Sequence, residues 1–342
     1  MAEPGGYMRD ITLGHTGITV PQNAFGALPI QRISTDDAVR LLRKAYDGGM
    51  RFFDTARAYS DSEEKVGLAF EGMRDKVFIS SKTMALTKEK FFEDLDTSLR
   101  LLKTDYLDIY QLHCVARCYS EGDELYEAMK EAKKQGKIRH IGITAHKIGV
   151  AEDIVKSGLY ETLQFPFSYL ASDRDIKLVS DCSKAGMGFI AMKGLAGGLL
   201  TNSEACMAFM SEHEALPIWG VQREKELDEW LSFFNKDISM TDEIRAFIDN
   251  DRKELMGEFC RGCGYCMPCT VDIKINQCAR MSQMIRRAPS QNWLTEYWQQ
   301  EMKKIENCVD CGVCKTRCPY GLDIPPLLKK NLKDYMEILG GQ

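Results

Sequence analysis

KEKFFEDLDTSLRLLKTDYLDIYQLH, residues 88 to 113, joins two kinds of segment that recur along most of the chain. Its first half mixes apolar and charged residues with the period of a helix that has one polar face. Its second half ends in the short apolar run LDIYQLH, which is typical of a strand buried on both faces. A helix that is followed by such a strand favours an α/β fold with a parallel sheet.

The same alternation extends from residue 35 to about residue 235. Apolar runs predict eight strands, which are NAFGALP, MRFFDT, VFISS, LDIYQLH, IRHIGIT, TLQFPF, MGFIAMK and LPIWG. Helix-like segments separate them, and several of these end at a glycine, namely Gly48, Gly136, Gly158 and Gly186. Eight strands that alternate with helices predict a (β/α)8 TIM barrel. A doubly wound sheet is the alternative, but no G-x-G-x-x-G motif follows the first strand.

The composition limits the classes of function. A formal net charge of -5 gives no long-range attraction to nucleic acid or to an anionic membrane. No apolar run has the length of a signal peptide or of a membrane span. The 13 cysteines are clustered and lack a secretion signal, which favours metal binding over a disulfide framework. We therefore expect a cytoplasmic protein without nucleic-acid or membrane partners.

Polar residues close three neighbouring strands at the end where barrels carry their functional sites. Asp54 ends the second strand, Lys82 the third and His113 the fourth, and Tyr59 follows five residues after Asp54. Because neighbouring strands lie about 4.8 Å apart, these side chains can meet. Each alone is ordinary, since an Asp after a strand is usually a turn residue and a lone Lys is usually solvated. Four of them in one register predict a catalytic site.

The stretches FFDTARAY, SSKT and QLH resemble the aldo-keto reductase superfamily, whose catalytic tetrad falls on Asp54, Tyr59, Lys82 and His113. The resemblance covers roughly residues 8 to 235. It implies that hydride reduces a carbonyl carbon while Tyr59 protonates the oxygen. Lys82, held by Asp54, is expected to lower the pKa of Tyr59. His113 is expected to orient the substrate oxygen.

The resemblance also implies positions for a nicotinamide cofactor. Thr144 takes the place of a serine hydroxyl after the fifth strand, and Gln164 keeps the glutamine that holds the nicotinamide amide. Glycines after the seventh strand would let backbone approach a pyrophosphate, and Arg223 near a helix start would meet a 2'-phosphate. A simple turn at Gly198 and a solvated Arg223 are the alternatives. We expect NADP(H) to be bound by Thr144, Gln164, Lys193, Gly194, Leu195, Gly198, Gly220 and Arg223.

Two runs of four cysteines follow the barrel segment. The second run has the C-x2-C-x2-C-x3-C-P spacing of bacterial two-cluster ferredoxins, and the first run is a near copy with a shorter last spacing. The cysteines of the two runs are Cys260, Cys263, Cys266 and Cys269, and then Cys308, Cys311, Cys314 and Cys318. The fourth cysteine of such a run serves the other cluster. The pattern therefore predicts two [4Fe-4S] clusters, with Cys318 and Cys269 exchanged between the runs.

Two alternatives stay open for this region. Cys278 would take the place of Cys269 if the shortened spacing keeps Cys269 away from the second cluster. Structural zinc also takes four thiolates, although typically from two C-x2-C pairs. The segment between the runs resembles a helical ferredoxin, and the fusion resembles the iron-sulfur branch of the aldo-keto reductases. We expect a barrel over residues 1–236, a helical linker over 237–257 and a ferredoxin-like domain over 258–342.

This combination predicts an oxidoreductase, and three accounts of its activity remain. In the first, the barrel reduces a small carbonyl substrate with NADPH. The clusters then hold the carboxyl-terminal domain over the mouth of the barrel or respond to redox conditions. In the second, the clusters relay single electrons from a ferredoxin-like partner to a substrate or a flavin in the barrel, although no flavin motif is evident. In the third, the chain is a non-catalytic redox-sensing subunit.

Overall fold

A computed structural model describes residues 8–255, 259–287 and 290–340 of the chain. Eight parallel strands close into a barrel in the order β10, β3, β4, β5, β6, β7, β8 and β9. The barrel strands are β3 (Ala24–Gly26), β4 (Phe52–Asp54), β5 (Phe78–Thr83), β6 (Leu107–Val115), β7 (Ile138–Ala145), β8 (Thr162–Pro166), β9 (Gly188–Met192) and β10 (Leu216–Gly220). They fall within or overlap the eight runs identified in the sequence, which confirms the predicted (β/α)8 TIM barrel.

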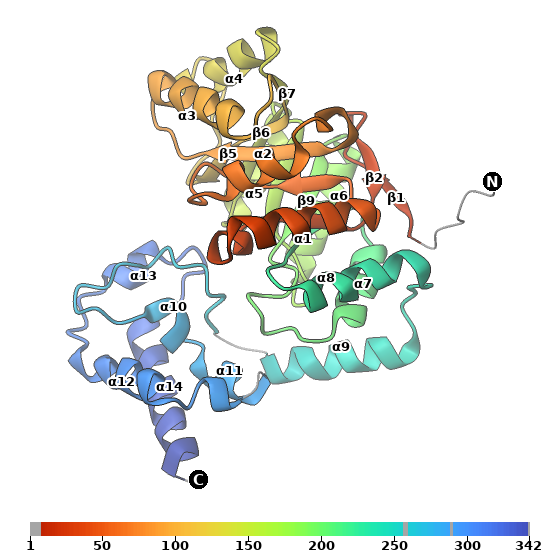
Figure 1. Cartoon of the computed structure of the whole chain (residues 1–342). Coiled ribbons are helices and arrows are strands. Elements are labelled where there is room, and N and C mark those ends of the chain that lie inside the picture. Colours follow the sequence, from red (N-terminus) through yellow and green to blue (C-terminus); the bar gives the residue numbers. More distant parts are fainter. Residues whose placement is uncertain (1–7, 256–258, 288–289, 341–342) are drawn as a thin grey trace. The chain divides into compact units, whose positions relative to one another are not determined.

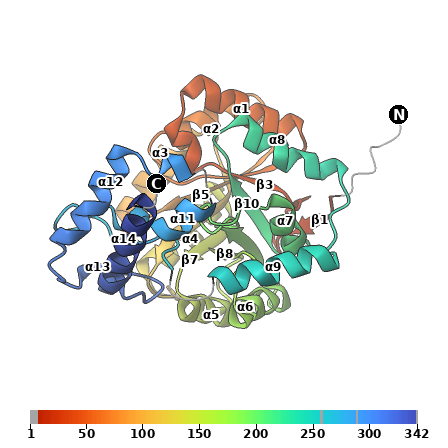
Figure 2. The ribbon, with the colours of Figure 1, turned by 90° about the horizontal axis from the view of Figure 1, so that it is seen from below.

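Helices surround the barrel strands, and Figure 2 shows the strands inside this ring. The helices are α1 (Thr35–Asp47), α2 (Ser62–Phe70), α3 (Lys88–Leu101), α4 (Glu124–Lys134), α5 (Ile148–Ser157), α6 (Asp173–Lys184), α7 (Ser203–Ser211) and α8 (Glu224–Ser232), with short 3-10 turns η1 (Pro29–Arg32), η2 (Arg74–Lys76) and η3 (Phe233–Asn235). Local sequence sets their ends. The side chain of Ser34 accepts a hydrogen bond from the backbone N–H of Asp37 at 3.1 Å and caps α1. Gly158 ends α5 with a left-handed φ of 64°.

A hairpin that the sequence analysis does not foresee closes the amino end of the barrel. Its strands β1 (Asp10–Thr12) and β2 (Thr19–Pro21) pair antiparallel. Ile11, Leu13, Ile18 and Val20 are buried in one cluster with side chains of the barrel strands. Burial of a side chain of this size stabilises the fold by about 1.5–3 kcal/mol. The hairpin therefore seals the end of the barrel opposite to the strand ends that carry the predicted site.

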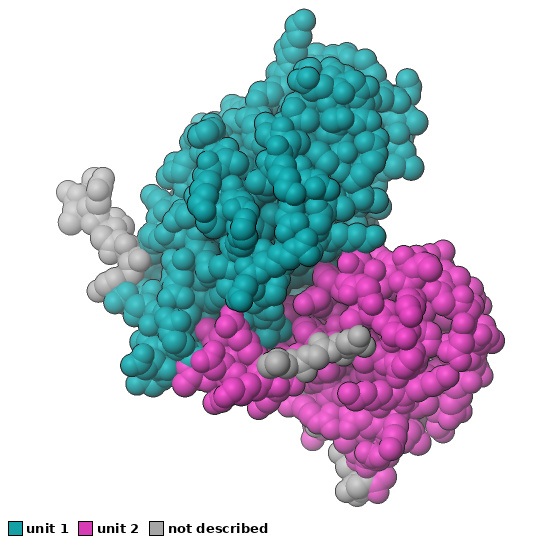
Figure 3. Space-filling model, turned by 180° about the vertical axis from the view of Figure 1, so that it is seen from behind, with its two compact units in different colours: residues 1–194, 203–245 teal, residues 195–202, 246–342 magenta. Residues whose placement is uncertain are grey.

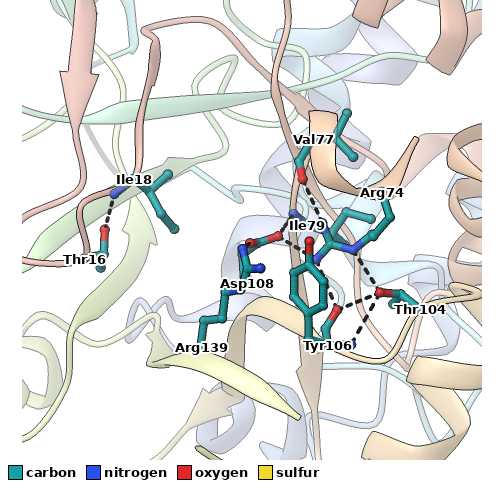
Figure 4. A network of polar contacts seen from close by, with 9 residues as sticks. All are labelled: Thr16, Ile18, Arg74, Val77, Ile79, Thr104, Tyr106, Asp108 and Arg139. Carbon is teal, nitrogen blue, oxygen red and sulfur yellow. Dashed lines mark hydrogen bonds and ion pairs between the residues drawn. The ribbon is translucent and has the colours of Figure 1, made fainter. Parts of the chain in front are cut away.

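Polar contacts also fix the amino end of the barrel, as Figure 4 shows. The buried Asp108 at the start of β6 accepts hydrogen bonds from the backbone N–H of Ile79 at 2.8 Å and from Arg74 Nη2 at 2.6 Å. Its second oxygen accepts from Arg139 Nη1 at 3.0 Å. Both guanidinium groups lie over the ring of Tyr106. At this end of a barrel, such contacts contribute to stability rather than to catalysis.

The chain divides into two compact units, which are coloured separately in Figure 3. The first unit comprises residues 1–194 and 203–245, and the second comprises residues 195–202 and 246–342. The border between them falls inside α9 (Asp242–Leu255), so a helix does occupy most of the expected linker. The three-part division itself remains a prediction, because its last boundary involves residues 256 to 258, which lie outside the described residues.

The second unit is helical (Figure 1). Beyond α9 its elements are α10 (Ile275–Cys278), α11 (Met281–Arg287), η4 (Ser290–Asn292), α12 (Glu296–Lys303), η5 (Lys304–Asn307), α13 (Val313–Arg317) and α14 (Ile324–Gly340). Its core combines apolar residues such as Ile273, Leu328 and Tyr335 with cysteines of both runs. The helices therefore gather the thiols in one core. Within the described ranges, every helix is too short or too polar to cross a lipid bilayer.

Candidate functional site

The first unit brings Asp54 and Lys82 together at the carboxyl ends of β4 and β5. Lys82 Nζ donates to Asp54 Oδ2 at 2.6 Å and to the backbone carbonyl of Thr55 at 2.6 Å. Both ionisable side chains are almost completely buried. The strands pair in parallel, with Asp54 opposite Ser80, so Lys82 lies on the same inward-facing row two residues further along β5. The pair is therefore a product of strand register.

Tyr59 and His113 complete the predicted set of four side chains. Lys82 Nζ lies 5.3 Å from the ring centre of Tyr59. The rings of Tyr59 and His113 meet edge to face, with centroids 5.8 Å apart and an interplanar angle of 80°. Residues from β4, β5, β6 and the loop after β4 thus converge on one place. Nδ1 of His113 is buried and has no hydrogen-bond partner among the described residues.

The loop that carries Tyr59 is fixed to its neighbours by hydrogen bonds. The backbone N–H of Arg57 donates to the carbonyl of Lys82 at 2.9 Å. Ser62, at the start of α2, donates to the carbonyl of Ala27 at 3.0 Å and lies 2.9 Å from the hydroxyl of Thr55. The loop is therefore tied to β5 on one side and to the end of β3 on the other. This places the Tyr59 ring without relying on solvent-exposed contacts.

Burial and the neighbouring ammonium group set the charge state of this site. Burial raises the pKa of Asp54 and lowers the pKa of Lys82, and in each case the opposite charge of the partner acts against that shift. Burial, with a smaller effect from the Lys82 charge, lowers the pKa of His113 to about 3. The imidazole is therefore neutral at pH 7, with one nitrogen able to donate and the other able to accept.

The pKa of Tyr59 moves in the direction opposite to the predicted one. Burial raises it, and the charges of Asp54 and Cys114 add to the increase. The expectation that Lys82 lowers this pKa is wrong, because the loss of solvent around the phenol has the largest effect and the charge of Asp54 adds to it. Tyr59 therefore holds its proton firmly at neutral pH. A neutral phenol is a hydrogen-bond donor, which is the form that a general acid requires.

Gln111 belongs to the site although it was not among the predicted residues. Its Nε2 donates to the hydroxyl of Ser80 at 2.8 Å and to Oε1 of Gln164 at 2.8 Å, and it lies 3.5 Å from Oδ1 of Asp54. The predicted cofactor residue Gln164 is thus connected to the carboxylate of Asp54 through this amide. Alternation along β6 offered a signal, since Gln111 lies two residues before His113 and therefore faces the same side.

Thr144, Lys193 and the unpredicted His146 lie around the end of β7. The hydroxyl of Thr144 accepts from the backbone N–H of Cys114 at 2.6 Å and holds that residue at a left-handed φ of 57°. His146 is 6% exposed, and burial, followed by the charges of Lys193 and His113, lowers its pKa to about 2. These effects place His146 near both side chains. His146 lies two residues after Thr144 in the sequence, but this position alone does not identify it as a site residue.

The other predicted cofactor residues are more dispersed. A Cβ at Gly194 would lie 2.5 Å from Cζ3 of Trp219, and a Cβ at Gly220 would lie 3.1 Å from Cγ of Pro29. Leu195 and Gly198 belong to the segment that is counted with the second unit. Arg223 precedes α8, is largely exposed, and its Nε donates to Glu226 at 2.7 Å. An anion near Arg223 would therefore compete with this carboxylate.

The first three cysteines of the first run gather with Cys318 in the second unit. Burial raises the pKa of Cys260, and the charges of Cys263 and Cys318 add to that change. Burial also raises the pKa of Cys266 to about 12, and the charges of the other three thiols contribute. The four sulfur atoms are therefore close enough to influence one another. This is the grouping that the exchanged-cysteine pattern predicts.

Cys269 lies with the first three cysteines of the second run. It lines one hollow together with Cys308, Cys311 and Cys314, and Cys266 of the first group borders the same hollow. Cys278, the alternative ligand, is buried elsewhere, and its Sγ donates to the carbonyl of Glu301 at 3.8 Å. The geometry thus brings Cys269, and not Cys278, to the second group of thiols.

Each group supplies four thiols, which is the donor set of a [4Fe-4S] cluster. Four thiolates can also hold a structural zinc ion, with sulfur about 2.3 Å from the metal. Within the described residues, no three His, Cys, Asp or Glu side chains are placed to hold a single metal ion.

Comparisons of sequence point in the same direction. The model of the Aldo/keto reductase family matches residues 22–216, and that of the 4Fe-4S dicluster domain matches residues 259–323. L-galactose dehydrogenase of Arabidopsis thaliana is 30% identical over 212 residues, which cover 55% of this chain and 66% of that protein. Methylglyoxal reductase DkgB of Salmonella typhimurium is 31% identical over 211 residues, which cover 58% of this chain and 76% of that protein.

Solved structures show the same fold for the barrel. An aldo-keto reductase from Bacillus halodurans superposes with a TM-score of 0.62 at 21% identity and covers 71% of this chain and 96% of its own. An aldo-keto reductase from Klebsiella pneumoniae in complex with NADPH superposes with a TM-score of 0.60 at 23% identity, covering 71% of this chain and 94% of its own. These structures match the barrel, and the cysteine-rich second unit of this chain is an addition to that shared fold.

Proposed function

The chain belongs to the aldo/keto reductase family, and from this premise we propose that its barrel reduces an aldehyde or ketone with NADPH. The observation that carries the proposal is the convergence of Tyr59, His113 and the buried Lys82–Asp54 pair. The reductase names of the relatives support it. The matched regions span only 64 to 67% of the first three relatives, so their substrates do not transfer directly.

A polar atom at the strand ends supports a bound nucleotide. His113 Nδ1 is buried without a hydrogen-bond partner among the described residues. At Gly194 there is no room for a side chain beside Trp219, so backbone faces this region. We propose that Thr144 and Gln164 hold the nicotinamide end of NADP(H) and that Arg223 lies at the 2'-phosphate. The part of NADP(H) between the nicotinamide and the 2'-phosphate would be lined by Lys193, Gly194, Leu195, Gly198 and Gly220.

The protein's own residues supply the proton and the orientation. NADPH, when bound, supplies hydride to the carbonyl carbon, which leaves negative charge on the oxygen. Neutral His113 donates a hydrogen bond that holds this oxygen, and Tyr59 transfers its phenolic proton to it. An alkoxide is a stronger base than a phenolate, so the raised pKa of Tyr59 still permits the transfer.

The Lys82–Asp54 pair stabilises the phenolate that remains after this step. Among the contacts of the described residues, Lys82 Nζ uses two of its three N–H groups on Asp54 and Thr55. We propose that the third N–H faces the Tyr59 oxygen when charge develops there. A fixed ammonium in a site without water stabilises such a charge strongly. Asp54 keeps Lys82 protonated and in place.

In the second unit we propose two [4Fe-4S] clusters that accept and pass single electrons when bound. The first would be held by Cys260, Cys263, Cys266 and Cys318, and the second by Cys269, Cys308, Cys311 and Cys314. The dicluster family match and the grouping of the thiols support this assignment. None of the 13 cysteines in the described part of the chain forms a disulfide, which supports a reducing compartment such as the cytoplasm.

A second candidate function is a one-electron reductase fed by a ferredoxin-like partner. Exposure of Cys311 favours it, because an accessible ligand shortens the path from an external donor. Turnover with NADPH alone in a Cys311→Ser variant would argue against this candidate. Turnover of the unmodified chain that requires a reduced one-electron donor, and that is lost in the same variant, would argue for it.

The test of the barrel uses protein purified without oxygen and a panel of small aldehydes and ketones. We expect NADPH oxidation coupled to alcohol formation, and a loss of about 10²–10⁴-fold in kcat in Tyr59→Phe. Tyr106→Phe, at the opposite end of the barrel, is the matched control and should keep full activity. Equal activity of Tyr59→Phe and the unmodified protein would refute the role of the phenol. Iron-free, zinc-loaded protein would refute the clusters.

A further inference from the structure

Arg280 is a buried cation between α10 and α11 in the second unit. Its side chain is 3% exposed, and its Nε has no hydrogen-bond partner among the described residues. Nη2 donates to the carbonyl of Gly197, which is neutral. Within the described residues, the ionisable side chain whose charge acts on Arg280 is Cys260, a proposed cluster ligand. A guanidinium without a buried carboxylate beside it needs another source of negative charge, since burial of an isolated ion costs several kcal/mol.

Two glycines enclose this guanidinium. A Cβ at Gly197 would lie 2.5 Å from Nη1 of Arg280, and a Cβ at Gly262 would lie 2.2 Å from the same atom. Both glycines have left-handed φ values, of 72° and 66°. Gly262 lies between Cys260 and Cys263, so the backbone of the first cysteine run closes directly on Arg280. The position of the charge is therefore fixed relative to that run.

The second group of thiols has a different electrostatic environment. Cys311 is exposed, and the carboxylate of Asp310 accepts a weak hydrogen bond from Cys308 Sγ at 3.8 Å. Asp310 also pairs with Lys329 at 3.0 Å, and both of these side chains are more than half exposed. Charges of both signs in contact with water have small net effects. The charge of Arg317 also acts on Cys311, but this arginine is exposed to water. The first group thus has a buried cation, and the second has only exposed, solvent-screened charges.

We propose that Arg280 raises the reduction potential of the cluster at Cys260, Cys263, Cys266 and Cys318 above that of the cluster at Cys311. The inference rests on the proposed two-cluster assignment. A cluster with four thiolates is negatively charged and gains one more negative charge on reduction, so a nearby fixed cation favours its reduced form. Net charge, hydrogen bonds and exposure are the factors that set such potentials.

This order gives single electrons a direction. A one-electron donor, itself oxidised by one electron, would reduce the cluster held near the exposed Cys311. That cluster would return to its oxidised state by passing the electron to the cluster held by Cys260, Cys263, Cys266 and Cys318. The transfer would make or break no bond and move no proton, and a first electron would remain beside Arg280.

The experiment is a potentiometric titration of the full-length, cluster-loaded protein, reduced stepwise with dithionite and followed by electron paramagnetic resonance. We expect two cluster signals with separated potentials. In Arg280→Gln the equilibrium constant for one-electron reduction of the higher-potential cluster should fall by at least tenfold, which corresponds to a potential lower by about 59 mV. The potential of the other cluster should stay unchanged. Arg280→Lys should keep most of the separation. Arg286→Gln, an exposed arginine paired with Asp334, is the control and should change neither potential.

The outcomes separate the inference from the function on which it rests. Unmodified protein without cluster signals overturns the cluster assignment and the inference together. Two signals whose potentials are unaffected by Arg280→Gln, or that shift by equal amounts, overturn the inference alone. If Arg280→Gln does not load iron, Gly197→Ala decides, because its Cβ would lie 2.5 Å from Nη1 of Arg280 and displace the guanidinium, while its nearest contact in the cysteine run is the carbonyl of Arg261 at 3.0 Å. It should lower the same potential, and an unchanged potential in a loaded Gly197→Ala protein contradicts the proposal.

Discussion

At each end of the same group of strands, the barrel contains a buried carboxylate that is paired with a basic side chain. At the amino end, Asp108 accepts hydrogen bonds from Arg74, Arg139 and one backbone N–H (Figure 4). At the carboxyl end, Asp54 accepts from Lys82 at 2.6 Å. The residue types are similar, and both carboxylates are buried. Burial and pairing alone therefore do not distinguish a structural group from a catalytic one.

The difference lies in what surrounds each pair. Both oxygens of Asp108 are used, and the two guanidinium groups are stacked on Tyr106 with their central carbons 4.1 and 3.7 Å from its ring centre. At the other end, the ammonium of Lys82 borders the ring of Tyr59, and His113 Nδ1 lacks a partner among the described residues. One pair is complete in itself. The other leaves polar groups available for a ligand.

The largest expected effect comes from Lys82→Met. Removal of the ammonium leaves the Tyr59 phenolate without a stabilising cation, so we expect kcat for carbonyl reduction to fall by about 10³-fold or more. Steady-state NADPH oxidation measures it. Arg139→Met removes a cation at the amino end and should leave kcat within about threefold of the unmodified value. Comparable losses of kcat in the two variants would contradict the proposal that only the carboxyl end of the barrel takes part in catalysis.

Asp108→Asn should show the opposite pattern. It removes the carboxylate charge from Arg74 and Arg139, and because Arg139 is half exposed we expect a loss of about 1–3 kcal/mol of unfolding free energy. Urea denaturation followed by tryptophan fluorescence measures this change. Activity per folded molecule should be unchanged. A variant as stable as the unmodified chain would show that the network in Figure 4 does not hold the barrel.

Stability should fall in mild acid because of two histidines at the carboxyl end. The pKa is lowered to about 3 in His113 and to about 2 in His146, whereas an unfolded imidazole titrates near 6.5. Below pH 6.5 the unfolded chain binds protons that the folded chain does not, so stability falls progressively from there toward pH 3. We expect a loss of about 2 kcal/mol per histidine at pH 5, relative to pH 7.5. Urea denaturation at both pH values tests this, and His146→Gln should remove half of the difference.

The smallest expected effect concerns Arg223→Ala. This exposed arginine already pairs with Glu226, and exposed pairs contribute about 0–1 kcal/mol. We expect KM for NADPH to rise by no more than about fivefold, with KM for NADH unchanged. An equal rise for both nucleotides would show that Arg223 does not contact the 2'-phosphate.

Much of the fold could be predicted because the strands form continuous apolar runs. LPIWG, for example, has the same bounds as β10. The hairpin of β1 and β2 could not, because its strands have only three residues each. The four side chains of the site follow from strand-end positions. The pKa of Tyr59 does not, because its direction depends on how much solvent the folded chain removes.

In the second unit, the cysteine spacing predicted which thiols gather. It left open whether Cys269 or Cys278 joins the second group, because one residue fewer in a loop does not by itself decide where a side chain lies. The structure brings Cys269 to the hollow, since α10 carries Cys278 into the apolar core instead. Arg280 had no sequence signal, because its role depends on a glycine more than 80 residues away.

The most direct test compares Asp54→Asn with Asp108→Asn, the same substitution at the two ends of the barrel. The measurement is kcat/KM for NADPH-dependent carbonyl reduction at pH 7.5, normalised to folded protein. We predict a loss of at least about 100-fold in Asp54→Asn, because Lys82 loses the charge that keeps it protonated, and less than about threefold in Asp108→Asn. Equal losses in the two variants, or full activity in Asp54→Asn, would contradict the assignment of catalysis to the carboxyl end.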